Sequence, residues 1–237
     1  MDGTQPTNLL NILRFAISPS RVAVLARKLF KRLESQGKYS ASENLEWIRA
    51  HQRSRESLVM SAPDLWSEAL EFGQAFRERA KAILATVPFD MGAGGDYELL
   101  YWLTRYLKPE VIVETGVSAG WSSEAFLAAI RRNGAGKLYS SDFPYFRVRE
   151  PEKYIGILVS DRAGWELHMD GDEIALPRIL AAVPSVGLFH YDSDKSYSGR
   201  QFAVDVVHPK LTGPMVMDDI ADNSWFREFV QQPDRLV

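Results

Sequence analysis

Residues 111–123 read VIVETGVSAGWSS and decide the fold. The first three residues, 111–113, form a short continuous apolar run, which is typical of a strand buried on both faces of a parallel sheet. The chain then turns through Gly116 and Gly120 and enters a helix that we predict over 122–132. A strand, a glycine-bearing turn and a helix in this order predict the first unit of a doubly wound α/β domain.

The same alternation continues downstream. We predict further strands over 137–141, 165–168, 186–191 and 214–217, and helices over 96–107, 176–182 and 199–207. Strands that alternate with helices favour a mostly parallel, Rossmann-like sheet with helices on both faces. Ligands of such sheets bind at the carboxyl ends of the strands, so the residues that follow each strand are the candidates for a site.

The residues before this pattern predict a helical extension over 1–90, and the catalytic domain is expected over 91–237. Apolar residues recur at helical spacing over 65–83. Residues 21–32 mix basic and apolar side chains, which indicates an amphipathic helix that packs on its own domain or a second subunit, or that binds an anionic membrane. We expect these helices to favour a homo-oligomer.

Composition narrows the class of protein. A hydrophobic content of 46%, a charged content of 25% and a net charge of -3 are ordinary for a soluble globular protein and argue against a nucleic-acid partner. The chain has no cysteine, which excludes disulfides and thiolate catalysis and favours the cytoplasm. The apolar run over 9–17 contains Arg14 and is too short for a membrane span.

Polar residues at the first two strand ends suit an adenosine cofactor. Glu114 favours a cofactor with a cationic group, and the helix that follows favours a carboxylate at its N-terminus, near Ser122. Ser118 replaces the middle glycine that a dinucleotide fingerprint needs for its pyrophosphate. Asp142 follows the second strand, where an acidic residue accepts hydrogen bonds from ribose hydroxyls. The alternative interpretation is a tight structural turn that requires small residues.

Carboxylates gather after the last two strands. Residues 190–197 read HYDSDKSY, and Asp218 and Asp219 follow the final strand. Like charges at one rim repel, and a hard divalent cation with oxygen ligands would neutralise them. Such ligands suit magnesium, manganese or calcium. Alternatively, Asp194 and Asp219 are caps of helix N-termini.

Together these segments, over 91–226, resemble the metal-dependent O-methyltransferases of class I, the group with catechol O-methyltransferase and the macrolide-sugar O-methyltransferases. The resemblance rests on the segment 113–122, on Asp142, on the turn at 171–172 and on the pattern from Asp192 to Tyr197. It implies S-adenosyl-L-methionine (SAM) as cofactor, bound by Glu114, Gly116, Gly120, Ser122, Asp142 and Asp172. It also implies magnesium or another divalent cation held by Asp192, Asp218 and Asp219, with Lys195 as the general base.

The resulting hypothesis is a SAM-dependent O-methyltransferase that acts on a hydroxyl of a small molecule. A nicotinamide-dependent oxidoreductase on the same fold and a non-catalytic cofactor-binding module are the alternatives. The family adds two more strands where only eighteen residues follow Asp219, so the sheet is expected to lack its C-terminal edge. Aromatic side chains are expected either to line the acceptor pocket or to belong to the core: Trp121, Tyr145, Phe146, Tyr197, Trp225 and Phe226.

Overall fold

The computed structural model describes residues 37–143 and 150–232. Its α-helices are α3 (Ala41–His51), α4 (Arg55–Val59), α5 (Pro63–Leu84), α6 (Tyr97–Leu107), α7 (Trp121–Asn133), α8 (Asp172–Ala182), α9 (Tyr197–Val207) and α10 (Trp225–Val230). Two short 3-10 helices, η1 (Pro151–Lys153) and η2 (His208–Lys210), complete the helical elements of these ranges. None of the described helices is long and apolar enough to cross a membrane. The predictions on 9–17, 21–32 and 145–146 lie outside the described residues.

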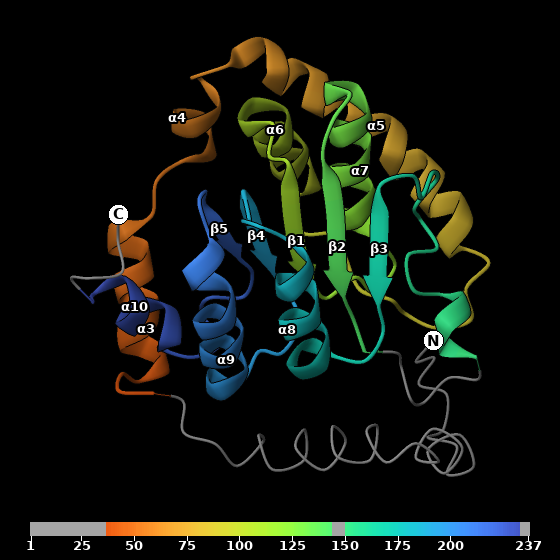
Figure 1. Ribbon diagram of the computed structural model, residues 1–237. Coiled ribbons are helices and arrows are strands. Elements are labelled where there is room, and N and C mark those ends of the chain that lie inside the picture. Colours follow the sequence, from red (N-terminus) through yellow and green to blue (C-terminus); the bar gives the residue numbers. More distant parts are fainter. Residues whose placement is uncertain (1–36, 144–149, 233–237) are drawn as a thin grey trace.

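The sheet confirms the predicted fold class. Its five strands are parallel and follow the order β3-β2-β1-β4-β5 (Figure 1). They are β1 (Val111–Thr115), β2 (Lys137–Ser141), β3 (Trp165–His168), β4 (Leu188–Tyr191) and β5 (Met215–Met217). The chain moves outward from β1 to β3 and then returns to the other side of β1, so the switch point lies between β1 and β4. Open α/β sheets bind their ligands at such a point.

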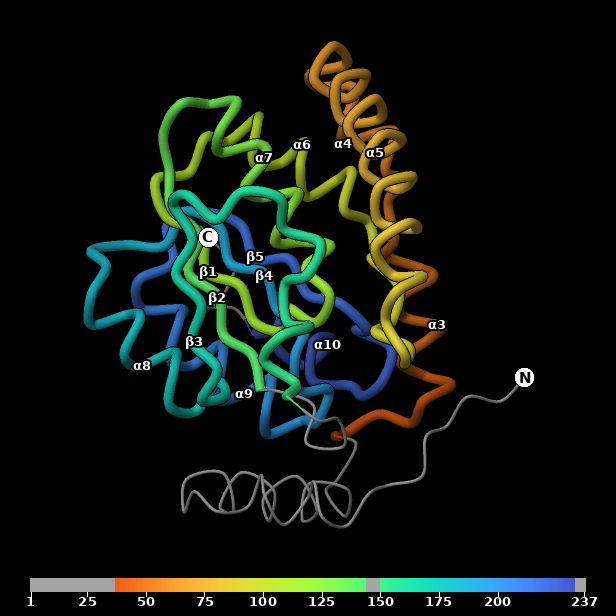
Figure 2. Tube along the Cα trace, turned by 90° about the vertical axis from the view of Figure 1, so that its right-hand side faces the viewer, coloured from red at the N-terminus to blue at the C-terminus, as the bar shows by residue number. Residues whose placement is uncertain are grey.

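Helices cover both faces of the sheet, as the alternating pattern predicts. One apolar core contains residues of α5, α6, α7 and β1, and a second contains residues of α8, α9, α10 and β4. Figure 2 shows α5 as an outer layer, on the far side of α6 from the sheet. The N-terminal helices therefore share a core with the sheet domain, and the proposed domain boundary at residue 90 stays a prediction.

Local sequence explains where several helices begin. Ser40 and Glu43 form a capping box at α3, and Asp96 caps α6 by accepting a hydrogen bond from Leu99 N at 3.3 Å. Ser196 caps α9 in the same way. By contrast, α7 begins at Gly120, which adopts φ 94 and has no side chain to cap the helix. The N-terminus of α7 therefore carries no side-chain cap of its own.

Two helices begin two or more residues earlier than the pattern predicts. Helix α9 starts at Tyr197 because Ser196 caps it, and α8 starts at Asp172 directly after Gly171, which has φ 83. Asp172 and Glu173 are the first residues of α8, where the helix dipole favours negative charge. The predicted turn at 171–172 thus leads directly into the first turn of α8.

Helices α3 and α10 lie together beyond β5 (Figure 1). Asn44 of α3 is buried, and its Nδ2 donates to the carbonyls of Ile220 at 3.3 Å and Asn223 at 3.0 Å. Arg227 of α10 donates to the carbonyl of Glu43 at 3.0 Å. In the described part of the chain no strand follows β5, and the N-terminal helix α3 packs on the segment that does.

Candidate active site

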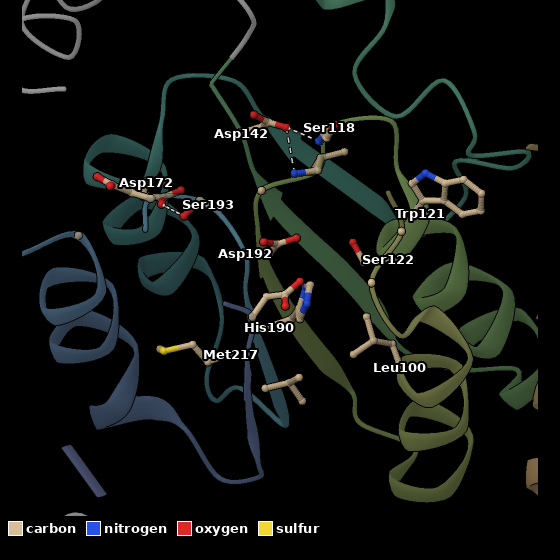
Figure 3. Close-up of a pocket in the computed structure, with 18 of the residues that line it drawn as sticks. Leu100, Ser118, Trp121, Ser122, Asp142, Asp172, His190, Asp192, Ser193 and Met217 are labelled. Atoms are coloured by element: carbon tan, nitrogen blue, oxygen red, sulfur yellow. Dashed lines mark hydrogen bonds between the residues drawn. The ribbon is translucent and has the colours of Figure 1, made fainter. Parts of the chain in front are cut away.

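The candidate site is a cavity of about 360 Å³ at the carboxyl ends of β1, β2, β4 and β5. It brings together most of the strand-end residues that the sequence singled out. Ser122, Asp142, Asp172 and Asp192 line it (Figure 3). Gly116 and Asp218 line it as well. The cavity is not lined by four of the predicted residues: Glu114, Gly120, Lys195 and Asp219. Glu114 and Lys195 contact the lining residues Ser122 and Asp192. Gly120 and Asp219 precede or follow a lining residue in the chain.

The two glycines of the turn after β1 are required by the packing of the chain. Gly116 has φ 81, and a Cβ there would lie 2.2 Å from the carbonyl oxygen of Asp192. Gly120 has φ 94, and a Cβ there would lie 2.9 Å from Gly156 Cα. The turn is therefore a tight structural turn, in which Gly116 lets the chain approach the segment after β4 and Gly120 lets it approach Gly156. It still places the backbone of residues 116–118 at the cavity wall.

Glu114 is fully buried and contacts Ser122, which lines the cavity. Its carboxylate accepts hydrogen bonds from Ser122 at 2.5 Å, Ser123 at 2.7 Å and Ser140 at 2.7 Å. Burial raises the pKa of Glu114 to about 7, and these hydroxyls oppose the rise. In this arrangement Glu114 orients the first turn of α7 and the end of β2, and its cofactor contact stays a prediction.

Asp142 and Asp172 hold the cavity wall in shape. The Oδ2 atom of Asp142 accepts from the backbone N–H of Val117 at 2.9 Å and of Ser118 at 2.7 Å (Figure 3). Asp172 accepts from Ser141 Oγ at 2.7 Å and from Ser193 Oγ. Burial raises the pKa of Asp172 to about 6 against the effect of these two hydroxyls. Both aspartates thus connect neighbouring strand ends around the space where a ligand would lie.

The other acidic residues form a cluster with a lysine. The Nζ atom of Lys195 contacts Asp192 Oδ1 and lies 3.0 Å from Asp219 Oδ2. Burial lowers the pKa of Lys195, but the two carboxylates outweigh it and raise the pKa above its usual value. The side chain is therefore a cation in this arrangement. The role of Lys195 as a base, which needs a neutral amine, stays a prediction.

The three predicted metal ligands fit a hard divalent ion by their chemistry. All are carboxylates, and the ammonium of Lys195 between Asp192 and Asp219 shows that the two together attract a cation. Their positions are not those of a preformed metal site. Within residues 37–143 and 150–232, no three acidic or histidine side chains are arranged to hold a metal ion. A divalent ion would need Lys195 to withdraw from the carboxylates.

The structure also shows site residues that the sequence did not predict. The loop 93–96 forms part of the cavity wall, and a Cβ at Gly95 would lie 3.4 Å from Asp218 Oδ2. His190 and the apolar residues Leu100, Phe202 and Met217 also line the cavity. His190 was visible in the segment HYDSDKSY. The other contacts depend on packing between helices and strands, which spacing along the chain does not reveal.

The aromatic residues divide between the cavity and the core. Trp121 lines the cavity and stacks on Tyr97 with a centroid distance of 5.2 Å. Trp225 is buried against Phe229 with its Nε1 donating to Gln201 at 2.9 Å. Tyr197 donates its hydroxyl to Glu228 at 2.9 Å, and Phe226 packs on the second core. Of the described aromatics in the prediction, Trp121 alone is an acceptor-wall candidate.

A parallel sheet with a cavity at its switch point and carboxylates around the rim defines a ligand-binding α/β enzyme fold. Residues 113–220 match the family model of a methyltransferase domain. The chain therefore carries a methyltransferase domain over these residues, which confirms the class predicted from the resemblance. A nicotinamide-dependent oxidoreductase is not favoured by this match.

Several solved structures are similar to the chain. A methyltransferase from Geobacter sulfurreducens is 14% identical over 84% of this chain and 90% of its own, with a TM-score of 0.48. A methyltransferase from Podospora anserina bound to S-adenosylhomocysteine is 15% identical over 78% and 77%, with a TM-score of 0.49. The O-methyltransferase TomG from Streptomyces achromogenes, in complex with SAM, is 16% identical over 81% and 76%, with a TM-score of 0.46. A comparison with curated proteins gave no match.

Proposed function

We propose that the protein is a SAM-dependent O-methyltransferase that acts on a hydroxyl group of a small molecule. The observation that carries the proposal is the cavity itself. It joins a glycine turn and a helix N-terminus on one side with the carboxylates after β4 and β5 on the other. The first side suits the cofactor, and the second suits an acceptor whose hydroxyl must lose a proton.

The cofactor would lie along the turn after β1. The uncapped N-terminus of α7 favours the carboxylate of the methionine moiety, because backbone N–H groups and the helix dipole point there. The acidic residues of the wall suit the ammonium and sulfonium charges of SAM, whereas a pyrophosphate would be repelled. Asp142 and Asp172 lie at the ends of β2 and α8, where the ribose and adenine are proposed to bind.

A divalent cation at Asp192, Asp218 and Asp219 is part of the proposal. When bound there, it would orient the acceptor oxygen and lower the pKa of the acceptor hydroxyl. Lys195 has two states in this scheme. With the carboxylates free, its ammonium neutralises Asp192 and Asp219. With the carboxylates engaged elsewhere, the amine loses the interactions that raise its pKa and becomes able to accept a proton.

Apolar side chains also line the acceptor side of the cavity, beside the carboxylates. Leu99 and Leu100 of α6, Phe202 of α9 and Met217 of β5 are among the residues that line it. Such a lining suits a small molecule with an apolar body, held in place by a few polar groups. The proposed partner is therefore a small hydroxylated acceptor, and no observation favours a nucleic acid.

Two measurements test the proposed function. Calorimetry should show binding of S-adenosylhomocysteine and none of NAD; the reverse result would overturn the proposal. Transfer of a labelled methyl group from SAM to a panel of hydroxylated small molecules should then occur and should fall when a chelator is added. Transfer that is indifferent to the chelator would reject the cation while leaving the methyltransferase in place.

Asp192→Asn separates the cofactor from the acceptor half of the site. This variant removes one carboxylate next to Lys195 and leaves the turn after β1 intact. We expect methyl transfer to fall at least about tenfold while the affinity for S-adenosylhomocysteine changes little. Unchanged transfer would show that Asp192 has no part in the reaction.

Location and assembly complete the proposal. The absence of cysteine fits a reducing compartment, so we propose the cytoplasm, which cell fractionation would test.

We also propose a homo-oligomer formed through the N-terminal helices. Light scattering on the full chain should give a mass above that of one 26.8 kDa chain, and a monomer would reject it.

A further inference from the structure

Ser118 lies in the turn after β1, in a backbone conformation that suits glycine. Its φ is 48, in the left-handed region, where a residue with a Cβ is strained. The backbone N–H of Ser118 donates to Asp142 Oδ2 at 2.7 Å, which keeps the turn in this shape (Figure 3). Glycine would fit the position without strain. A serine that keeps a strained conformation in the wall of the cavity indicates a use for its side chain.

The side chain of Ser118 is bonded to the segment that leads into α6. Its Oγ donates to the carbonyl oxygen of Met91 at 2.6 Å, although the two residues are 27 apart in the chain. Met91 is 5% exposed, so this hydrogen bond restrains the loop at a buried residue. Residues 93–96, which follow Met91, line the cavity. The hydroxyl of Ser118 therefore connects one end of this loop to the turn that carries the proposed cofactor.

A second contact restrains the other end of the loop. Asp96 accepts hydrogen bonds from Nη1 of Arg55 in α4, at 3.2 Å on Oδ1 and at 3.1 Å on Oδ2. The guanidinium of Arg55 also lies over the ring of Trp66 in α5, 4.9 Å from the ring centroid. Both partners of the ion pair are partly exposed, so it adds little to the free energy of unfolding. Its effect is to hold Asp96 against the N-terminal helices.

Between these two contacts the loop packs against both sides of the cavity. A Cβ at Gly94 would lie 2.7 Å from Cδ2 of Trp121, the first residue of α7. A Cβ at Gly95 would lie 3.4 Å from Oδ2 of Asp218, which follows β5. The loop thus extends from the helix after the cofactor turn to the carboxylates of the acceptor side. Its position sets the space that is left for an acceptor beside Asp218.

We propose that Ser118 and Arg55 are positioning residues that hold the loop 92–96 in place as a wall of the acceptor side of the cavity. The proposal rests on the proposed function and adds to it two residues that act through the loop. Loss of either contact leaves the cofactor turn in place, because Asp142 still accepts from the N–H groups of Val117 and Ser118. The acceptor then binds less tightly, while the chemical step is little changed.

The test compares two variants that lack the Ser118 hydroxyl with matched controls in the full chain. Ser118→Ala keeps the backbone strain and Ser118→Gly relieves it, so an effect that both share comes from the hydroxyl. Lys108→Gly is the control, since Lys108 has φ 47 and does not line the cavity. Arg55→Met is compared with Arg53→Met, a change at an exposed arginine two residues away.

Transfer kinetics use SAM and the hydroxylated panel compound that wild type methylates fastest. Both Ser118 variants and Arg55→Met should raise the KM of this acceptor about fivefold. Their kcat and their affinity for S-adenosylhomocysteine should change less than about twofold, because the cofactor turn keeps its hydrogen bonds to Asp142. Lys108→Gly and Arg53→Met should change none of these quantities.

Hydrogen exchange over 92–96, measured by mass spectrometry, reports on the loop without an acceptor. Exchange should be about tenfold faster in the Ser118 variants and in Arg55→Met, and unchanged in the controls. Ser118 variants with the exchange and acceptor KM of wild type would overturn the proposal. A loss of S-adenosylhomocysteine affinity as large as the rise in acceptor KM would overturn it too, because Ser118 would then be a cofactor contact. Failure of the proposed function is seen separately, as wild type that neither binds S-adenosylhomocysteine nor transfers methyl groups.

Discussion

At the scale of single residues, the site depends on side chains and glycines that serve the packing of the chain as well as any ligand. Glu114 is the clearest case. It was predicted as a cofactor residue, and in the structure its buried carboxylate accepts hydrogen bonds from three serine hydroxyls. An acidic residue at the tip of a buried strand is thus explained in part by the turn that it holds together.

Glu114 predicts a pH dependence of stability. Its pKa is raised from 4.5 to about 7 on folding. The folded state therefore binds this proton more tightly than the unfolded state does. The contribution of the protonated carboxyl to the free energy of unfolding is fully present below pH 4.5 and is lost as the pH rises through 7. Between pH 4.5 and 8 the unfolding free energy of wild type should fall by up to about 3 kcal/mol more than that of Glu114→Gln, which has no carboxyl to ionise at this position. Urea unfolding of both proteins across this range measures it. Parallel curves would contradict the burial of an ionisable carboxyl here.

Gly116 allows a matched test of close packing. Gly116 and Gly134 have similar φ angles of 81 and 76, but a Cβ would clash with Asp192 O at Gly116 and meet nothing within 4 Å at Gly134. Gly134→Ala should lower the unfolding free energy by about 1 kcal/mol, the cost of the left-handed conformation alone. Gly116→Ala should lower it by about 3 kcal/mol or more and weaken S-adenosylhomocysteine binding. If urea unfolding gives equal losses of unfolding free energy for Gly116→Ala and Gly134→Ala, the turn at Gly116 can move away from the backbone of Asp192.

At the scale of elements, helix α9 supports the loops that carry the carboxylates. Arg200 of α9 is fully buried and donates to the carbonyls of Asp218 at 3.1 Å and Asp219 at 2.7 Å. Asp219 has φ 49, an unfavourable conformation for a residue other than glycine. The two hydrogen bonds from Arg200 stabilise the backbone at Asp218 and Asp219. Helix α9, rather than the preceding strand β5, therefore fixes the conformation of these residues.

Replacement of Arg200 tests this support. Arg200→Met should lower the unfolding free energy by about 3 kcal/mol, because both carbonyls lose a charged donor. Arg178→Met is the control, since Arg178 pairs with Asp170 at 3.1 Å on the surface and should cost less than about 0.5 kcal/mol. Chemical denaturation compares the two. If Arg200→Met lowers the unfolding free energy no more than Arg178→Met does, the backbone at Asp218 and Asp219 keeps its conformation without the hydrogen bonds from Arg200.

At the scale of the whole molecule, the N-terminal helices and the segment after β5 form one structure. Asn44 of α3 is 1% exposed and donates to Ile220 and Asn223, directly after the carboxylates at 218 and 219. Residues separated by about three quarters of the chain thus meet beside the cavity. The helical extension is connected to the candidate site through this contact.

Asn44→Ala should therefore affect both stability and catalysis. Two carbonyls lose their donor, which should lower the unfolding free energy by about 1–3 kcal/mol. We also expect slower methyl transfer with unchanged S-adenosylhomocysteine affinity, because the change lies on the side of the cavity near β5. Glu46→Ala on the exposed side of the same helix is the control and should change neither. Normal transfer by Asn44→Ala would restrict the N-terminal helices to a structural role.

The sequence alone determined the order of strands and helices and the methyltransferase class. Continuous apolar runs such as 111–113 and the turn after Glu114 are local signals, because buried strands and tight turns restrict residue type directly. Only the tertiary structure decided what the strand-end residues contact. Glu114 meets serines of two elements, Lys195 reaches carboxylates after two strands, and His190 faces a cavity whose wall includes residues 93–96. These contacts join segments distant in the chain, and their formation depends on packing that no spacing within one segment records.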